Sequence, residues 1–125
     1  MKVMALFLTG LGSLALAADL RVIHLRCESQ TDPLALDVAR PRLSWVLESG
    51  TRGQRQTAYR VVVASTEARL GQEQGDRWDS GKIESGEQNQ IEYAGKPLAS
   101  NAECFWKVRV WDKDGKPARW SKLAR

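Results

Sequence analysis

Acidic side chains are the residues in this sequence that come nearest to a catalytic arrangement. Those of the second half fall beside turns or beside Lys and Arg, and the candidates are Asp76, Asp79, Glu84, Glu92, Asp112 and Asp114. Two carboxylates that cleave a glycosidic bond must flank a cleft, about 5 Å apart or about 6.5–9.5 Å apart. Acidic residues beside turns and basic neighbours are instead typical of solvated loops. We predict that the chain has no catalytic residue.

The sequence offers little support for a metal site or for catalysis by histidine. His24 is the single histidine, so neither a Ser-His-Asp relay nor a histidine-based metal site can be assembled within the chain. A strand histidine with its hydrogen bonds satisfied is the simpler interpretation. Asp112-Lys113-Asp114-Gly115 begins like a calcium loop, but Lys116 takes a ligand position and no Glu follows where one is needed. We interpret the segment as a hairpin turn and expect no metal and no cofactor.

Two cysteines, Cys27 and Cys104, leave two alternatives open. A disulfide between them would close a long loop and stabilise the chain by about 4 kcal/mol in the chain-entropy model. Strands of opposite sheets lie about 10 Å apart, however, and only well-aimed pairs can be bridged. The spacing favours two separate buried thiols. It does not fit a zinc site.

Two of the five tryptophans, Trp78 and Trp111, are candidates for a sugar-stacking platform. We expect them on or near the sheet face opposite the core-facing Trp106. Exposed indoles beside polar groups bind sugars, and this would give a glycan as partner. The alternative is that an adjoining domain, or the chain itself, covers both rings.

The first residues predict export. Met1-Lys2 supplies a positive start, Val3 to Leu16 is largely apolar, and Ala15-Leu16-Ala17 offers the small residues that a signal peptidase reads. The apolar run is shorter than the roughly 20 residues of a spanning helix. We predict a signal peptide at 1–17, a periplasmic or extracellular location, and no membrane association after cleavage. The formal charge of +4 suits an anionic partner, but export argues against nucleic acid.

The remaining chain, 18–125, has the pattern of one all-β domain. Phe105 to Trp111 alternates apolar and polar residues, with Trp106, Val108 and Val110 on one face, and Asp114-Gly115 then sets a hairpin turn. Similar strands are expected at 20–27, 40–47, 58–64, 82–84 and 90–93, with one capped helical turn at 67–70 that Gly71 stops. The polar segment 48–57 is expected to be an exposed loop. Strands that recur every 10 to 15 residues predict an antiparallel two-sheet sandwich.

Four ordered motifs then resemble one family. They are Pro41-Arg42-Leu43-Ser44-Trp45, Gln56-Thr57-Ala58-Tyr59-Arg60-Val61, Trp78-Asp79-Ser80-Gly81-Lys82 and the run from Trp106 to Asp112. Together they resemble the N-terminal immunoglobulin-like (fibronectin type III-like) domain of bacterial alpha-L-rhamnosidases, glycoside hydrolase family 78. The resemblance implies an immunoglobulin-like sandwich over 18–125. It also implies that the last strand is truncated at Arg125, which would leave the neighbouring strand edge unpaired.

Function follows from that resemblance as an expectation. In the family a large helical domain downstream carries out hydrolysis, so this chain would be a non-catalytic accessory module of an exported rhamnosidase-like hydrolase, and a fragment of it. Its partner would be the missing catalytic region, and a rhamnose-containing glycan is a further candidate. The alternative is a free-standing envelope sandwich that binds carbohydrate or protein.

Overall fold

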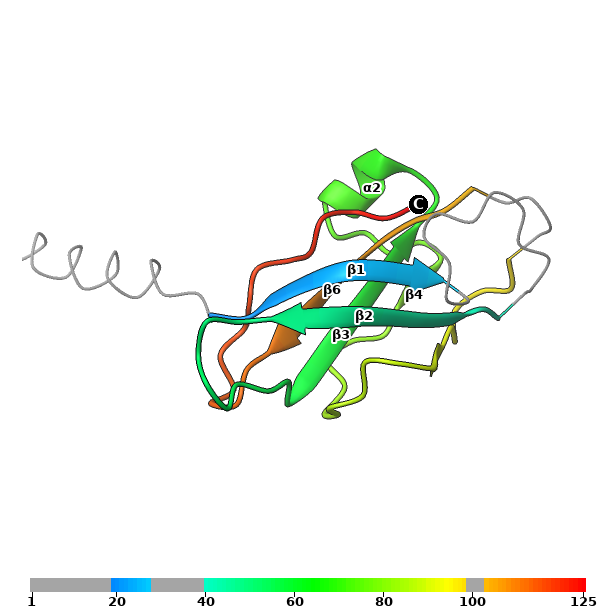
Figure 1. Ribbon diagram of the computed structural model, residues 1–125. Helices are drawn as coiled ribbons and strands as arrows, with labels where there is room; N and C mark the ends of the chain where they lie inside the picture. The colour runs from blue at the N-terminus through cyan, green and yellow to red at the C-terminus, as the bar shows by residue number, and fades with distance from the viewer. Residues whose placement is uncertain (1–18, 28–39, 99–102) are drawn as a thin grey trace, which may run out of the picture.

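The computed structural model describes residues 19–27, 40–98 and 103–125, so the predicted signal peptide at 1–17 lies outside it. Within these ranges no helix is long and apolar enough to cross a membrane. The strands are β1 (Arg21–Cys27), β2 (Arg42–Glu48), β3 (Ala58–Ala64), β4 (Trp78–Asp79), β5 (Ile91–Glu92) and β6 (Phe105–Trp111) (Figure 1). They form two antiparallel three-stranded sheets, ordered β1-β2-β5 and β4-β3-β6. The mostly-β, two-sheet prediction is confirmed.

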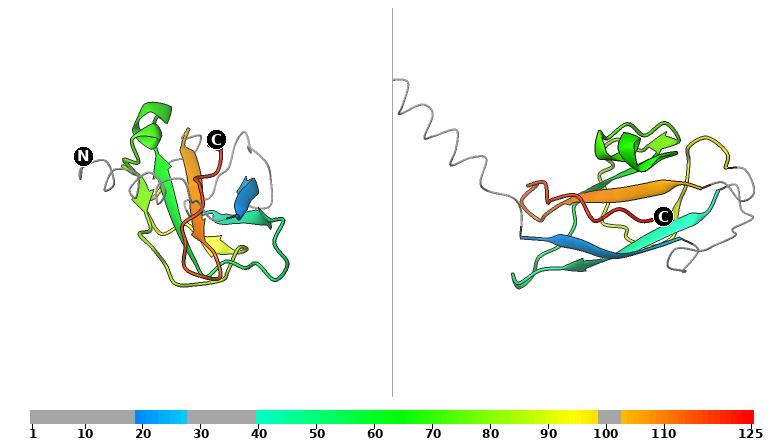
Figure 2. Two further views of the ribbon diagram at one scale, coloured as in Figure 1. Left: turned by 90° about the vertical axis from the view of Figure 1, so that its left-hand side faces the viewer. Right: turned by 90° about the horizontal axis from the view of Figure 1, so that it is seen from above.

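The two sheets lie face to face as separate layers (Figure 2). The helix α2 (Glu67–Gly71) sits on the outer side of the β4-β3-β6 sheet, away from β1 and β2. Side chains from both inner faces make one core that includes Leu43 and Trp45 from the first sheet and Val61, Trp106 and Val108 from the second. Burial of this shared apolar surface holds the layers together.

β2 shows how the alternation sets the register. Trp45 is 3% exposed and Leu43 is also buried, whereas Arg42 points to solvent. Because successive strand residues point to opposite faces, Ser44 and Val46 must then face outward. Trp45 packs edge-on against Tyr59 with ring centroids 5.4 Å apart. Leu43 and Trp45 therefore form the inward face of this strand.

β1 departs from strict alternation at one point. Its pairing with β2 shifts between Ile23 and Arg26, so that β1 carries one extra residue, and His24 has a φ of 52°. Such a bulge turns the following side chains over. Val22 and Leu25 both point into the core, and His24 is left outside. A regular strand would have buried the histidine and exposed the leucine.

The outer face of the β4-β3-β6 sheet is also partly covered. Val62, Ala64, Leu70 and Phe105 form a second buried cluster beneath α2, with Trp120 packed against it. Thr66 caps the helix by accepting a hydrogen bond from the Arg69 N–H, as its position predicts. The helix ends at Gly71, one residue later than the expected end at residue 70. The backbone turns left-handed at Glu73, where φ is 58°.

The hairpin after β6 is confirmed, but the expected open edge is not. Gly115 has a φ of 78° in the turn, and the segment 117–125 then runs back along β6. Trp106 exchanges two backbone hydrogen bonds with Ala124, and Ser121 donates its N–H to the Val108 carbonyl. The prediction that the edge of β6 lacks partners is therefore wrong. Truncation of the last strand at Arg125 stays a prediction.

The strand expected at 82–84 is also shorter than predicted. It consists of a single bridge in which Ile83 and Tyr59 exchange two backbone hydrogen bonds. Before it, Asp79 and Ser80 lie beside β3, and Gly81 turns the chain with a φ of 67°. The segment from 84 to 90 then crosses from one sheet to the other, which brings it alongside β2.

Candidate functional site

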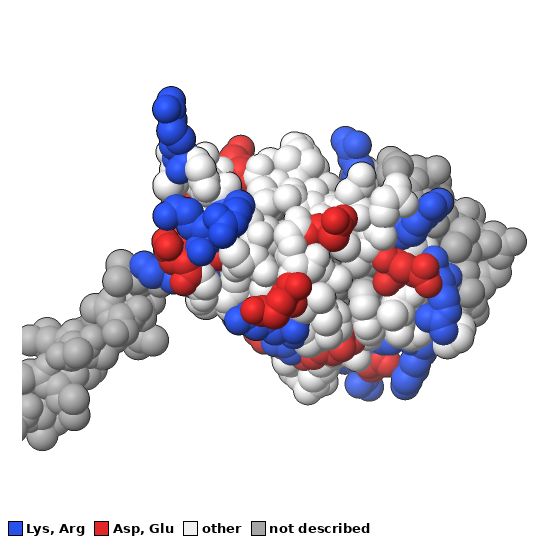
Figure 3. Space-filling view, turned by 90° about the horizontal axis from the view of Figure 1, so that it is seen from below, with Lys and Arg blue, Asp and Glu red and all other residues white. Residues whose placement is uncertain are grey.

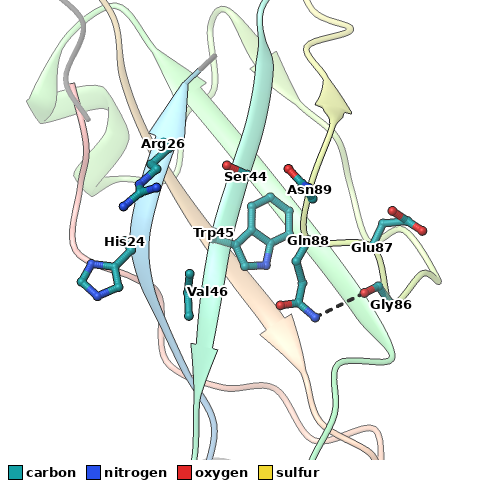
Figure 4. A pocket seen from close by; sticks show the side chains of 9 residues that line it. All are labelled: His24, Arg26, Ser44, Trp45, Val46, Gly86, Glu87, Gln88 and Asn89. Atoms are coloured by element: carbon teal, nitrogen blue, oxygen red, sulfur yellow. Dashed lines mark hydrogen bonds between the residues drawn. The ribbon is translucent and has the colours of Figure 1, made fainter. Parts of the chain in front are cut away.

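A shallow trough of about 450 Å³ lies on the outer face of the β1-β2-β5 sheet (Figure 4). Its lining comes from β1, from β2 and from the segment that precedes β5: His24, Arg26, Ser44, Trp45, Val46, Gly86, Glu87, Gln88 and Asn89. We call it the β2 trough. Polar side chains from three segments of the chain line it.

The shape of the β2 trough follows from side-chain lengths. β2 is the middle strand, and the outward residues at its centre, Ser44 and Val46, are short. The neighbours are longer, with His24 and Arg26 on the β1 side and Glu87, Gln88 and Asn89 on the other side (Figure 4). Short side chains between long ones make a floor between two walls. Val46, which is 46% exposed, is the apolar part of that floor.

One wall depends on the bulge. His24 is exposed because the extra residue in β1 turns it outward, and its imidazole makes no hydrogen bond to another described residue. The expected place of this histidine on a strand is confirmed, and because its ring faces solvent, the satisfaction of its hydrogen bonds stays a prediction. The bulge could not be found in the sequence, since a regular strand accommodates the same residue types.

The other wall depends on Gln56, which is buried with 4% exposure. Its Nε2 donates to the carbonyls of Ser85 (2.9 Å) and Glu87 (2.8 Å), and its Oε1 accepts from Nε1 of Trp45 (3.0 Å). The Trp45 backbone N–H also donates to the Gln88 carbonyl at 3.0 Å. Gln56 thus ties residues 85–88 to the core. The prediction of an exposed loop at 48–57 is wrong at this residue.

The polar side chains of the trough are not committed to one another. Within the described ranges Arg26, Ser44, Glu87 and Asn89 make no side-chain hydrogen bond, and Gln88 makes one long contact of 3.5 Å to the Gly86 carbonyl. Hydrogen-bonding groups that face a hollow without internal partners are free to bind a ligand. The trough offers both donors and acceptors.

The predicted sugar platform is not assembled. Trp78 pairs with Val63 and lies on the inner face, where its ring packs edge-on against Tyr93 at a centroid distance of 5.3 Å. Trp111 pairs with Ala58 at the far end of β3, and the Lys82 ammonium lies 5.0 Å from its ring centroid. The two indoles face opposite sides of the sheet. The interpretation that the chain itself covers Trp78 is the correct one.

Trp120 is the aromatic centre of the outer face of the β4-β3-β6 sheet. The side-chain cations of Arg60, Lys107 and Arg109 lie 5.5, 4.6 and 5.0 Å from its ring centroid. We call these four residues the Trp120 cluster. Burial, with the positive charges of Arg109 and Arg60, lowers the pKa of Lys107. Because cations already cover the ring, it is not free to stack on a sugar.

The carboxylates considered above mainly have structural partners. Asp79 accepts two hydrogen bonds from Arg60, at 3.0 and 2.7 Å, and this hydrogen bonding lowers the pKa of its carboxyl. Asp76 accepts from the Ser65 hydroxyl and N–H, which lowers its pKa as well. Lys82 lies 3.6 Å from Glu84. Glu92 is exposed on β5 opposite Arg42.

The segment that began like a calcium loop is a hairpin turn. The carboxylate of Asp112, which is 3% exposed, accepts the N–H groups of Asp114 and Lys116 at 2.9 and 2.8 Å. In the described part of the chain no three His, Cys, Asp or Glu side chains gather as a metal site would require. The oxygen that a cation would need is used here to hold the turn.

No disulfide joins Cys27 and Cys104, in agreement with the favoured alternative of two separate thiols. Cys27 ends β1 and Cys104 precedes β6, and both are half-buried against the core. Burial raises the pKa of the Cys104 thiol, so it is protonated at neutral pH. A protonated, half-buried thiol is a packing group and a poor nucleophile.

Charges on the face shown in Figure 3 are mixed. Lys and Arg side chains alternate with Asp and Glu around uncharged surface and do not form one area of single sign. A surface of this kind does not produce the extended positive field that attracts polyanions.

Comparison with known proteins agrees with this fold. Residues 22–125 match the family described as Rha78A-like, N-terminal immunoglobulin domain. The chain belongs to this family. The resemblance seen in the sequence motifs is thereby confirmed, and the two sheets are those of an immunoglobulin-like sandwich.

Among the relatives of this immunoglobulin domain, an alpha-L-rhamnosidase of Streptomyces avermitilis is 48% identical over 102 residues. Those residues are 82% of this chain and 10% of that enzyme. The crystal structure of that alpha-L-rhamnosidase complexed with L-rhamnose superposes with a TM-score of 0.79 at 47% identity, covering 84% of this chain and 10% of the other.

A second solved structure, the alpha-L-rhamnosidase from Dictyoglumus thermophilum, superposes with a TM-score of 0.83 at 36% identity. The matched region covers 87% of this chain and 12% of the Dictyoglumus enzyme. The chain thus spans about a tenth of the length of the enzymes that it matches.

Proposed function

We propose that this chain is the non-catalytic N-terminal accessory module of an exported alpha-L-rhamnosidase-like hydrolase. The observation that carries the proposal is the match of residues 22–125 to an N-terminal immunoglobulin domain that makes up only about a tenth of each related enzyme. The module's partner is then the catalytic region of the parent enzyme. Its role is to pack against that region and stabilise it.

The described surface supports a non-catalytic role. Asp112 holds a turn, Asp79 forms an ion pair with Arg60, and the hollow on the β1-β2-β5 sheet is shallow. Hydrolysis of a glycoside needs an acid with a raised pKa in a site that excludes water. Asp76 and Asp79 have lowered pKa values instead.

Export is part of the same proposal. The pattern of residues 1–17 directs the chain to the periplasm or the outside of the cell, with cleavage after Ala17. Mass spectrometry of the secreted chain should give a mature form that begins at Ala18. A chain that keeps Met1 and stays in the cytoplasm would contradict this.

A domain exchange tests the accessory role. The matching tenth of the Streptomyces avermitilis enzyme is replaced by residues 22–125, deleted, or replaced by an unrelated sandwich of similar size. We expect the first chimera to keep rhamnosidase activity and melting temperature, and the deletion to lose both. Equal rescue by the unrelated sandwich would show that no specific packing is involved. Hydrolysis of an aryl rhamnoside by the chain alone would contradict the proposal directly.

The β2 trough favours a second candidate function, a free-standing envelope protein that binds carbohydrate or protein. The two candidate functions predict different coding sequence downstream of the codon for Arg125. Coding sequence for a catalytic region that continues in phase from Arg125, or after a frameshift, supports the module. A genome without any such continuation supports the free-standing protein.

A further inference from the structure

The β2 trough is polar and nearly balanced in charge. Arg26 lies on one wall and Glu87 on the other, while Gln88 and Asn89 supply amide donors and acceptors. One cation opposite one anion does not select a charged ligand. Donors and acceptors that have no hydrogen-bond partner in the protein favour a neutral ligand rich in hydroxyl groups.

The dimensions suit a single saccharide chain. Neighbouring strands lie about 4.8 Å apart, so walls on either side of β2 are about 10 Å apart. The floor from Ser44 to Val46 spans about 7 Å of strand. That space admits a pyranose ring lying along β2 with its hydroxyl groups toward both walls.

Strained backbone stands on both sides of the trough. His24, in one wall, has a φ of 52°, and Gln90, which follows the other wall, has a φ of 60°. Left-handed conformations of residues other than glycine cost about 1–3 kcal/mol each and persist only where the surroundings enforce them. At His24 the strain sets where the wall's side chain points.

The floor is aliphatic, and this narrows the class of sugar. Val46 presents methyl groups at 46% exposure, with no aromatic ring exposed beside it in the trough. A small aliphatic patch fits a methyl group better than the broad apolar face of a pyranose. Hexoses that carry a methyl group in place of the hydroxymethyl group are the 6-deoxyhexoses. L-Rhamnose, the ligand in the related crystal structure, is one of them.

We propose that the β2 trough is a low-affinity site for a neutral saccharide with a 6-deoxyhexose such as L-rhamnose, its methyl group against Val46. The choice of rhamnose rests on the proposed function, whereas the 6-deoxyhexose class rests on the trough. A sugar held by a few hydrogen bonds and one methyl contact binds with a Kd on the order of millimolar. Such a site would hold the parent enzyme near a substrate chain.

The test compares two sugars on the full chain by ¹H–¹⁵N NMR titration. L-Mannose is L-rhamnose with the methyl replaced by a hydroxymethyl group. We expect L-rhamnose to bind about three- to fourfold more tightly, since one buried methyl contributes about 0.8 kcal/mol. The amide signals of residues 44–46 and 86–89 should shift.

Variants separate the floor from the wall. Val46→Thr keeps the shape and replaces a methyl with a hydroxyl, so the two sugars should bind equally. Asn89→Ala removes hydrogen bonds from the wall and should weaken both by about three- to tenfold. Ile83→Thr replaces an ethyl group with a hydroxyl at another exposed aliphatic residue, outside the trough, and should alter neither affinity.

Three outcomes would overturn the inference. They are no shifts at about 100 mM sugar, tens of times the expected Kd, shifts centred on the Trp120 cluster, or an unchanged preference in Val46→Thr. The domain exchange is independent of them. An active chimera without sugar binding would support the accessory role and contradict the sugar site in the trough. Sugar binding with an inactive chimera would support the sugar site and contradict the accessory role.

Discussion

Gln56 is the residue on which both the core and the trough depend. It satisfies the indole N–H of a core tryptophan, the carbonyl of Glu87 in the trough wall and the carbonyl of Ser85 beside it. A glutamine in this position uses nearly all of its hydrogen-bonding capacity inside the protein. Gln56 therefore stabilises the fold by pairing polar groups that would otherwise be buried without hydrogen-bond partners.

Replacing Gln56 with Leu should destabilise the fold by about 2–4 kcal/mol. The substitution introduces an apolar side chain of similar size and leaves Nε1 of Trp45 and two carbonyls unpaired. Hydrogen exchange at residues 85–88 should also become faster. Urea denaturation gives the first effect and exchange mass spectrometry the second.

Gln74→Leu, on an exposed glutamine, is the matched control and should change stability by less than about 0.5 kcal/mol. An equal denaturation midpoint for the two variants would mean that the Gln56 contacts contribute nothing net.

Trp45 is the largest contributor on its side of the core. We expect Trp45→Ala to cost about 3–5 kcal/mol, the usual cost of removing a buried large aromatic side chain. That is a large part of a typical domain's 5–15 kcal/mol. Trp111→Ala, at a half-exposed indole, should cost clearly less. Denaturant midpoints measure both, and equal losses would place Trp45 outside the core.

At the scale of elements, two like charges meet where β3 pairs with β6. Arg60 and Arg109 lie directly opposite each other on neighbouring strands, an arrangement that is unfavourable by itself. Asp79 on β4 binds the Arg60 guanidinium through two oxygens, and Trp120 lies under both cations. The carboxylate and the ring together allow the two arginines to be neighbours.

The Arg60–Asp79 pair predicts a pH dependence. Hydrogen bonding to Arg60 lowers the pKa of Asp79 below its ordinary value of 3.8, so the folded chain binds fewer protons than the unfolded chain. The stability from the pair is full above pH 3.8 and is lost as pH falls through the lowered pKa. Because the side chains are 28% and 36% exposed, the contribution is about 1 kcal/mol or less.

Asp79→Asn should remove that contribution at neutral pH and make the melting temperature fall less steeply between about pH 4 and pH 2. Glu84→Gln, at a more exposed ion pair, serves as the control. If the melting temperatures of wild type and Asp79→Asn fell equally steeply over this pH range, the assignment of the pH dependence to Asp79 would be contradicted.

At the scale of the whole molecule, the segment 117–125 completes the sandwich. It pairs with β6 from one end to the other, buries Ala118 and brings Trp120 onto the outer face. Without it β6 would be an open edge, and open edges associate with other chains. The fold therefore depends on these nine residues although they form no named strand.

Deleting residues 117–125 should lower stability by at least about 3 kcal/mol and cause association, because a packed tryptophan and the edge pairing are lost together. Denaturant unfolding and size-exclusion chromatography measure the two effects. Lys122→Ser, at an exposed side chain of the same segment, should show neither. A monomeric deletion variant of unchanged stability would mean that β6 needs no partner.

Local patterns in the sequence were sufficient for the main strands and for the hairpin. In regular strands alternation puts Trp45 and Val108 on the apolar faces, and Asp114-Gly115 favours one kind of turn by itself. Neither rule needs contacts between distant residues. Family membership followed for the same reason, since the motifs that carry it are these strands and turns.

The site was decided by tertiary structure. Gln56 is buried because its partners lie 11, 29 and 31 residues away, and no pattern within 48–57 separates it from its polar neighbours. His24 is exposed because a bulge in β1 adds one residue opposite β2, and the trough exists because Ser44 and Val46 meet longer side chains from two other segments. A sequence specifies which way a strand residue points by local alternation. Which side chains meet across strands depends on register and bulges, which form only when distant segments pack.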